Sequence, residues 1–360
     1  MKDELDSARN NINAIDEKIA ELFVKRMQEV EKISAYKQRH GLPIFDATRE
    51  QQIIEKNSLF VEENLRPYYV DFLKSTMNCS RRYQQRLQKG MKIAYSGVEG
   101  AFACIATKRI FPDGIRMAYS DFASAYKAVI DGECDACVLP IENSFAGEVG
   151  QVVDLIFDGE LSINGIFRLE IMQNLLGVKG AKKSDIKEVI SHAQALAQSD
   201  DYIKRNGFIA QERTNTAVAG KEVASRNDKT IGAIASIETA EIYGLEVIER
   251  NVNQSNVNTT RFAVLSKAKA NKENPSTILN FIVKHETGSL AKAINTISKH
   301  GFNMTALRSR PVKNHPWEYY FYVEIDGDVN SKDGLAMLKE MERVCEEIKV
   351  VGSYNPQMEI

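Results

Sequence analysis

The stretch IAELFVKRMQEVEKISAYK, residues 19–37, decides the fold of the N-terminal part of the chain. Its apolar residues recur at helical spacing and share one face: Ile19, Leu22, Val30 and Ile33. Arg26 and Lys37 each lie four residues after one of these, so both cations fall on the apolar stripe. Burying an unpaired cation costs several kcal/mol. The stripe therefore predicts an amphipathic helix whose cations need a partner.

The sequence around this stretch predicts three helices. Residues 1–40 contain no Gly or Pro, and at 1.5 Å per residue such a helix is about 55 Å long. Gly41 and Pro43 end it, and Asp46 is the expected N-cap of a second helix. A third helix is expected over residues 67–89, before Gly90. These helices cannot close a core alone, so we expect a dimer in which the long helices pack together.

Composition limits the function classes. The 360 residues are 43% hydrophobic and 27% charged with net charge -2, which is typical of a soluble globular protein and gives no reason to expect nucleic acid or a membrane as partner. The first residues contain no apolar signal segment, and cytoplasmic localisation is expected. Cys134 and Cys137 form one isolated CxxC, which predicts packing and no metal site.

The remaining chain changes pattern twice. From Met91, short strands alternate with helices, which predicts an α/β domain over residues 91–268. A polar segment, residues 267–276, leads to a final domain over residues 276–360. That domain has the order strand–helix–strand–strand–helix–strand, which is the ferredoxin-like α+β order. The all-α domain is assigned residues 1–90.

Arg9 joins Arg26 and Lys37 on a broad arc of the first helix. One interpretation is that these cations reach the surface or pair with nearby carboxylates at positions 16, 29 and 31. The other is a ligand with two carboxylates, because guanidinium groups bind carboxylates bidentately. Three cations on one arc favour the ligand.

The polar positions of this segment resemble those of the all-helical (type II) chorismate mutases. The matching residues are Arg9, the run IDEK at 15–18, Arg26, Lys37, Asp46, Arg49, Glu50, Ser80 and Gln84. The resemblance implies that Arg26, with Arg9 from a partner chain, holds the two carboxylates of chorismate. Lys37 and Gln84 would stabilise negative charge on the ether oxygen as the C–O bond breaks. Asp46 and Glu50 would receive the substrate hydroxyl, and Arg49 and Ser80 would support the site.

Four motifs lie in the middle domain: LPIENSFAG at 139–147, SHAQALAQ at 191–198, ERTNTAVAG at 212–220 and NTTRF at 258–262. Each places small hydroxyl or amide residues at the end of an element, as in α/β sheets that bind anions at helix N-termini. Residues 142–144 lie in an expected strand-to-helix turn, where capping alone would also explain them. Taken in order, the motifs resemble prephenate dehydratase.

The dehydratase resemblance implies two α/β lobes around a cleft, built like a periplasmic binding protein. It implies that Thr260 polarises the leaving hydroxyl of prephenate and that Arg261 holds a carboxylate. It places the remaining substrate-binding residues at Glu142, Asn143, Ser144, Gln194 and Thr259. Three positions depart from the family pattern: Ala103, Ala193 and Gln173 stand where serine, proline and histidine are usual.

The final domain resembles the ACT regulatory domain of this pathway, which binds phenylalanine. The resemblance implies effector-binding residues at Gly288, Ser289, Leu290, Asn303, Arg308, Ser309, Arg310 and Pro311. Arg308 stands where the family has glutamate and so reverses a charge. A dimerisation module without a ligand is the alternative.

We therefore expect a bifunctional enzyme that converts chorismate to prephenate and prephenate to phenylpyruvate, with phenylalanine as inhibitor. No metal or organic cofactor is expected, and the assembly is expected to be a homodimer or a higher homo-oligomer. One alternative is a mutase whose middle domain is inactive and senses a ligand. A second is a non-catalytic amino-acid sensor, against which the three cations of the helix argue.

Overall fold

The computed structural model describes residues 2–254, 258–269, 274–312, 318–356 and 358–360, and part of the predicted linker, 270–273, lies outside the described residues. The chain divides into two compact units, Met1–Met91 and Lys92–Ile360. Each is described by itself.

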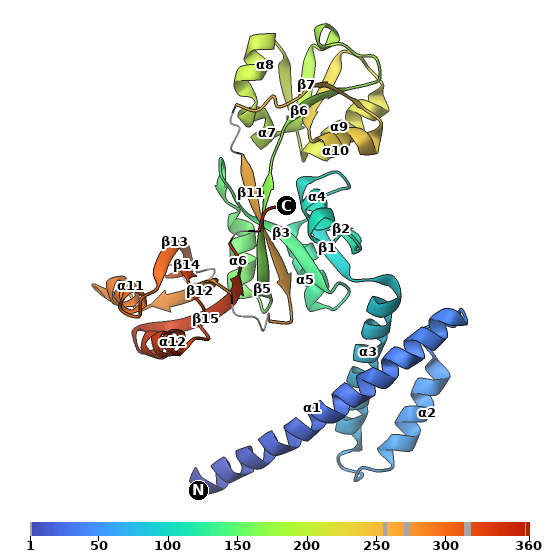
Figure 1. Cartoon of the computed structure of the whole chain (residues 1–360), viewed down its shortest axis with the longest axis vertical. Coiled ribbons are helices and arrows are strands. Elements are labelled where there is room, and N and C mark those ends of the chain that lie inside the picture. Colours follow the sequence, from blue (N-terminus) through green and yellow to red (C-terminus); the bar gives the residue numbers. More distant parts are fainter. Residues whose placement is uncertain (1, 255–257, 270–273, 313–317, 357) are drawn as a thin grey trace. The chain divides into compact units, whose positions relative to one another are not determined.

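The first unit consists of the three predicted helices, α1 (Lys2–Arg39), α2 (Ala47–Ser58) and α3 (Arg66–Lys89) (Figure 1). Asp46 caps α2 as predicted, because its Oδ1 accepts a hydrogen bond from Arg49 N at 2.9 Å. Gly90, with φ 86°, ends α3 as predicted.

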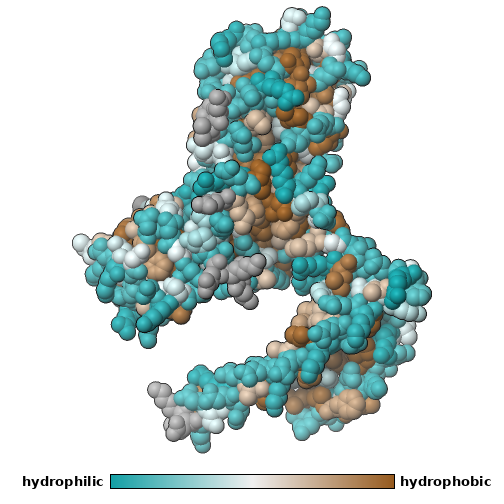
Figure 2. All heavy atoms as spheres, in the orientation of Figure 1, coloured by the Kyte–Doolittle hydropathy of each residue, from teal (hydrophilic) through white to brown (hydrophobic). Residues whose placement is uncertain are grey.

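The apolar stripe of α1 is not buried within this unit. Val30 is 6% exposed, but Ile19, Leu22 and Ile33 are 44%, 63% and 49% exposed. Figure 2 shows apolar side chains on the surface of these helices. The three helices of one chain therefore do not cover the stripe, in line with the expectation that they cannot close a core alone.

The second unit begins with a lobe built on one sheet. Its last strand, β11, comes after the second lobe in the sequence but pairs with β5 and β3 of this first sheet. Its elements are β1 (Lys92–Ser96), α4 (Phe102–Ile110), β2 (Ile115–Tyr119), α5 (Phe122–Ile130), β3 (Ala136–Asn143), β4 (Gly147–Glu148), α6 (Gly150–Asp158), β5 (Ser162–Glu170) and β11 (Thr259–Ser266). The strands lie in the order β5-β11-β3-β1-β2, with β4 paired to β3.

The second lobe has its own sheet in the order β10-β6-β9-β7-β8. Its elements are β6 (Asn174–Gly177), the 3₁₀ turn Lys183–Asp185, β7 (Glu188–His192), α7 (Ala193–Gln198), α8 (Asp200–Asn206), β8 (Ile209–Arg213), α9 (Thr216–Arg226), β9 (Ile231–Ala235), α10 (Ile237–Tyr243) and β10 (Glu246–Glu249). The chain thus crosses between the lobes after β5 and again before β11, which gives the predicted two-lobed α/β arrangement.

The C-terminal segment follows the predicted strand–helix order and continues the first lobe's sheet. It consists of β12 (Ser276–Val283), α11 (Ser289–Lys299), β13 (Asn303–Pro311), β14 (Tyr319–Asp326), α12 (Lys332–Val344) and β15 (Cys345–Tyr354), with strand order β13-β14-β12-β15. Gly352 of β15 meets Ile163 of β5, where a Cβ would lie 2.0 Å from the Ile163 carbonyl oxygen. Only glycine permits this approach.

Both faces of β14 are buried, and they face different cores. Val323 and Ile325 pack among the helices of their own segment, whereas Tyr320 and Tyr322 belong to the core of the first lobe. Tyr320 and Tyr322 thus join the C-terminal segment to the lobe.

Candidate active sites

In the first unit, Arg26 and Lys37 of α1 both bond to neighbouring segments. The Nη1 of Arg26 donates to Ser80 Oγ on α3, and Lys37 Nζ donates to the Ile44 carbonyl oxygen at 2.6 Å. Ser80 is buried and both cations are half-buried. The structure therefore brings three of the predicted residues to one side of α1.

Gln84 lies one turn beyond Ser80 on α3 and is 7% exposed. Its Oε1 has no hydrogen-bond partner among the described residues. A buried amide without a partner is costly, and turning it by 180° would present its NH₂ at the same place. This arrangement suits a polar ligand beside Gln84.

Glu50 lies near Arg81, which the sequence analysis did not single out. Nη1 of Arg81 donates to both carboxylate oxygens of Glu50, and its guanidinium lies 5.2 Å from the ring centroid of Phe45. Arg81 follows Ser80 and precedes Gln84 by three residues, so helical spacing alone could have pointed to it. Arg49 is exposed.

Arg9 is not brought to this site within one chain. It is exposed and lies 3.6 Å from the Asp6 carboxylate. It precedes Arg26 by between four and five helical turns, about 25 Å along the axis.

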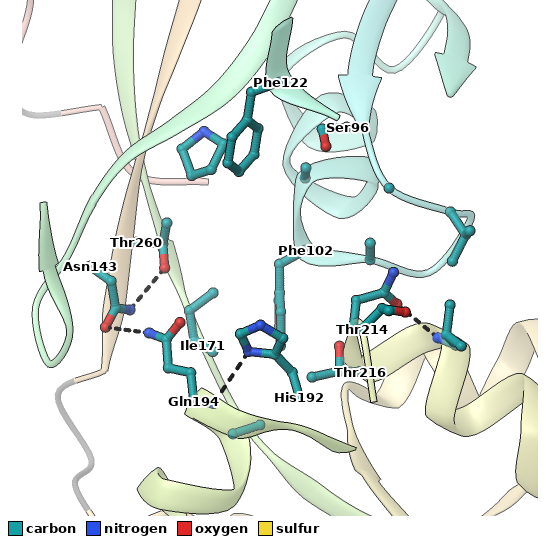
Figure 3. Close-up of a pocket in the computed structure, with 18 of the residues that line it drawn as sticks. Ser96, Phe102, Phe122, Asn143, Ile171, His192, Gln194, Thr214, Thr216 and Thr260 are labelled. Atoms are coloured by element: carbon teal, nitrogen blue, oxygen red, sulfur yellow. Dashed lines mark hydrogen bonds between the residues drawn. The ribbon is translucent and has the colours of Figure 1, made fainter. Parts of the chain in front are cut away.

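The second unit contains a cavity of about 750 Å³ between its lobes. Figure 3 shows Asn143 and Thr260 on one wall, with Thr214 and Thr216 on another. Its lining comprises Ser96, Gly97, Val98, Ala101, Phe102, Ala103, Ala118, Tyr119, Ser120, Phe122, Pro140, Asn143, Ile171, Gln173, His192, Gln194, Ala195, Gln198, Thr214, Asn215, Thr216, Val218 and Thr260. None of these described residues carries a formal charge as Asp, Glu, Lys or Arg.

Asn143 fixes the hydroxyl of Thr260. The Oδ1 of Asn143 accepts hydrogen bonds from the backbone N–H groups of Phe145 and Ala146 at 3.0 and 2.9 Å, which sets the orientation of the amide. Its Nδ2 then donates to Thr260 Oγ1 at 3.0 Å. Because that oxygen accepts from Asn143, the hydroxyl hydrogen of Thr260 is available to a ligand.

A row of amides supports this pair. Gln194 Nε2 donates to Asn143 Oδ1 at 3.0 Å, and Asn143 Nδ2 donates to Asn258 Oδ1 at 2.9 Å. Asn258 Nδ2 in turn donates to Gln198 Oε1 at 2.9 Å. Gln194 was predicted from its motif and Gln198 was not, although the two are four residues apart and share one helical face.

Several predicted residues lie outside the cavity lining. Strand alternation turns Glu142 and Arg261 away from it, and they pair with each other at 2.9 Å. Ser144 Oγ accepts from Thr259 N at 3.0 Å, so these two residues join β11 to the turn after β3. That turn leads into β4 rather than directly into a helix, which corrects the expected strand-to-helix turn; Gly147, at φ 80°, completes it.

The three departures from the family pattern do not disrupt the cavity. Ala193 begins α7, where the usual proline would also sit, because the first N–H of a helix needs no partner. Ala103 and Gln173 both line the cavity. Gln173 is 2% exposed, and its Oε1 has no partner among the described residues.

The predicted effector residues divide between two places. Gly288, with φ 82°, precedes α11, which Ser289 and Leu290 begin. Asn303 donates to Asp326 at 3.2 Å, and Ser309 and Pro311 lie on the exposed face of β13. Arg308 and Arg310 alternate to the other face and pair with carboxylates of the first lobe.

The CxxC cysteines are both buried, and burial raises the pKa of the Cys134 thiol. The described part of the chain contains no cluster of residues that could hold a metal ion. Its helices include none long and apolar enough to cross a membrane.

These two sites define an enzyme with two separate catalytic units, one helical and cationic and one two-lobed and lined by neutral amides and hydroxyls. The profile of the chorismate mutase type II family matches residues 8–85, and that of the prephenate dehydratase family matches residues 93–270. A bifunctional chorismate mutase/prephenate dehydratase from Aquifex aeolicus is 30% identical over 98% of this chain and 98% of its own.

Two solved structures resemble the second unit. A prephenate dehydratase from Arthrobacter aurescens, in complex with L-Phe, is 25% identical with a TM-score of 0.68, covering 73% of this chain and 89% of that one. GqqA, described as a quorum-quenching acylase, is 30% identical with a TM-score of 0.68, covering 73% of this chain and 97% of that one.

The chain belongs to the bifunctional chorismate mutase/prephenate dehydratase family. It is an enzyme of phenylalanine biosynthesis that rearranges chorismate to prephenate and converts prephenate to phenylpyruvate.

Proposed function

We propose that Lys37 and Gln84 carry the mutase step and that Thr260 carries the dehydratase step. The first unit, residues 1–90, is the mutase domain, and residues 91–268 form the dehydratase domain. The observation that carries the dehydratase assignment is the Asn143–Thr260 hydrogen bond inside the cavity. The mutase assignment is supported by the half-buried Lys37, by the Arg26–Ser80 hydrogen bond, and by Gln84 one turn beyond Ser80, whose Oε1 has no partner among the described residues.

The mutase rearrangement is pericyclic, so the site needs no nucleophile or general base. As the C–O bond of chorismate breaks, negative charge grows on the ether oxygen, and Lys37 and Gln84 stabilise it from fixed positions. Arg26, positioned by Ser80, binds one carboxylate. Arg81 holds Glu50, which, with Asp46, receives the substrate hydroxyl. Arg49 remains at the rim.

Arg9 supplies the second carboxylate contact from a partner chain, so that the mutase is at least a homodimer. Its distance from Arg26 along α1 excludes a shared site within one chain. The exposed apolar stripe of α1 supports a second copy as the missing packing partner.

In the dehydratase step, the carboxylate leaves as carbon dioxide, and its electrons aromatise the ring while the ring hydroxyl departs. Thr260 donates a hydrogen bond to that hydroxyl as the C–O bond breaks, and a proton from solvent completes its release as water. Asn143 and Gln194 orient the substrate, while Ser144 and Thr259 hold the strand end.

The carboxylates of prephenate lie at the N-termini of α4 and α9, whose first turns border the cavity at Phe102 and Thr216. This assignment replaces the expected role of Arg261, which is engaged with Glu142 and Glu324 instead.

Residues 276–360 form an ACT domain of ferredoxin-like order that binds phenylalanine and inhibits the dehydratase. The strand order and the L-Phe complex of the Arthrobacter relative support this assignment. Since Arg308 and Arg310 contact the first lobe, phenylalanine contacts Gly288, Ser289, Leu290, Asn303, Ser309 and Pro311. Five free thiols suit a cytoplasmic location.

To test this, purified protein is incubated with chorismate, and the formation of prephenate and of phenylpyruvate is measured separately, with and without phenylalanine. We expect phenylpyruvate to form and to decrease when phenylalanine is added. A rate of phenylpyruvate formation that phenylalanine does not change would contradict the effector role. Prephenate that accumulates without phenylpyruvate would contradict the role of the cavity and favour the inactive-domain alternative.

A further inference from the structure

A set of ion pairs joins the C-terminal segment to the first lobe of the dehydratase. Its cations are Arg261 of β11 and Arg308 and Arg310 of β13. Its anions are Glu142, Glu148, Asp154 and Glu324. We call these seven residues the arginine network. Each side chain is 27% exposed or less, so solvent screens these pairs less than it screens surface pairs.

The network begins directly behind the catalytic strand pair. In the antiparallel register of β11 and β3, Thr260 is opposite Asn143, and Arg261 is opposite Glu142. Alternation along the strands points the first pair into the cavity and the second pair toward the C-terminal segment. A bulge follows at once, between Arg261 and Phe262, and bulges re-aim side chains beside active sites.

Arg308 is the second arginine that bonds the carboxylate of Glu142, after Arg261. Its Nη2 lies 2.5 Å from Glu142 Oε1, and its guanidinium lies 5.3 Å from the ring centroid of Tyr322. Arg261 occupies the other carboxylate oxygen of Glu142 and also bonds Glu324, which is 3% exposed. Glu142 is therefore held from two strands at once.

Arg310 anchors the element that follows the β3–β4 hairpin. It bonds Asp154 of α6 at 2.6 Å and Glu148 of β4 at 2.8 Å. Its guanidinium also lies against Gly150, where a Cβ would come within 2.5 Å of it. Through Arg308 and Arg310, β13 thus contacts Glu142, just before Asn143, and Glu148 and Asp154, just after the turn that follows it.

We propose that Arg308 is a positioning residue for the dehydratase step. It acts through Glu142, which with Arg261 fixes the strand pair that presents Asn143 and Thr260 to the substrate. Loss of Arg308 leaves Glu142 tied to Arg261 alone and lets the end of β3 shift. Because small displacements of a reacting group reduce rate strongly, kcat falls while substrate binding at α4 and α9 persists.

The network also gives the effector a route to the cavity, and this part rests on the proposed function. Phenylalanine on the exposed face of β13 contacts the same strand whose other face carries Arg308. A shift of β13 then moves Glu142 and, one residue further along, Asn143.

The experiment compares Arg308→Ala, Arg308→Lys and Glu142→Gln in the full-length enzyme. We expect Arg308→Ala to lower the dehydratase kcat about tenfold with KM within about twofold, and Arg308→Lys to recover part of it. In the Glu142→Gln background, Arg308→Ala should add little, because both changes break the 2.5 Å Arg308–Glu142 contact, and the other carboxylates near Arg308, Glu148 and Glu324, lie 3.5 Å away. Mutase activity of the same chain reports folding and concentration.

Arg343→Ala, which removes an exposed arginine of α12, is the matched control and should leave both activities unchanged. A dehydratase kcat within twofold of wild type in Arg308→Ala would overturn the proposal. So would effects of Arg308→Ala and Glu142→Gln that multiply in the double variant.

Calorimetry with phenylalanine separates the two proposals. We expect phenylalanine to bind both wild type and Arg308→Ala but to inhibit only wild type. Equal inhibition of both would overturn the coupling route. No heat with folded wild type would overturn the effector role, while the kinetic comparison would still decide the positioning role.

Discussion

The two catalytic units bind dianionic substrates by different means. The proposed mutase site uses cations of α1, and Arg9, one of them, does not reach it within a single chain. The dehydratase cavity is lined by neutral groups, and its Asn143–Thr260 pair is complete in one chain. The difference follows the chemistry: a charge that develops on oxygen needs a cation, whereas a departing hydroxyl needs a hydrogen-bond donor beside it.

Lys37→Ala tests this division most strongly. Removing the cation beside the breaking C–O bond should lower the mutase kcat about 10³-fold, whereas dehydratase activity on added prephenate should remain. Both are measured on one preparation. Lys32→Ala, which removes an exposed cation of the same helix paired with Glu29, is the control. Equal losses at both sites would show that the units do not act separately.

Mixed dimers test which site needs two chains. Co-expressed Arg9→Ala and Lys37→Ala chains, each inactive alone, should recover about a quarter of the wild-type mutase activity, because a twofold dimer restores one site in each hybrid. Co-expressed Asn143→Ala and Thr260→Val chains should recover no dehydratase activity, since both residues come from one chain. Recovery in the second mixture, or none in the first, would reverse the comparison.

The sequence predicted local features of both units better than contacts between distant strands. Helix periodicity, the Asp46 cap and the association of Asn143, Gln194 and Thr260 all depend on short spacings or on strand ends at one cleft. The orientation of Arg261 depends on Glu324, which is 63 positions away along the chain. No local pattern shows that two such strands meet.

The functional residues that were not predicted also fall into these two groups, those at short spacings and those whose partners are distant in the sequence. Arg81 and Gln198 share helical faces with residues that were predicted, so spacing could have found them. Asn258 opens a motif whose Thr260 was predicted, but its amide partners lie on α7 and β3. Arg308 was singled out as a reversed charge, and its acidic partner became clear only from the packing of β13 against the lobe.

The smallest effect we predict concerns stability in the arginine network. Burial alone would raise the pKa of Glu324, but hydrogen bonds from Arg261 and Tyr354 hold it below the usual 4.5. A lowered folded-state pKa stabilises the fold above the unfolded value and ceases to do so as pH falls through the folded value. Glu324→Gln keeps the shape of the side chain but loses its charge-assisted hydrogen bonds, and should destabilise the second unit by about 2 kcal/mol at pH 7.

Thermal unfolding at a series of pH values measures this difference. The gap in Tm between wild type and Glu324→Gln should be about 5 °C at pH 7 and should shrink as the pH falls below 4.5. Glu340→Gln, which removes a carboxylate that is 35% exposed and pairs with Lys299 and His300, should change Tm little. A gap that stays constant down to pH 3 would mean that Glu324 contributes packing rather than charge. The arginine network would then hold the cavity in place through shape and packing, with little contribution from charge.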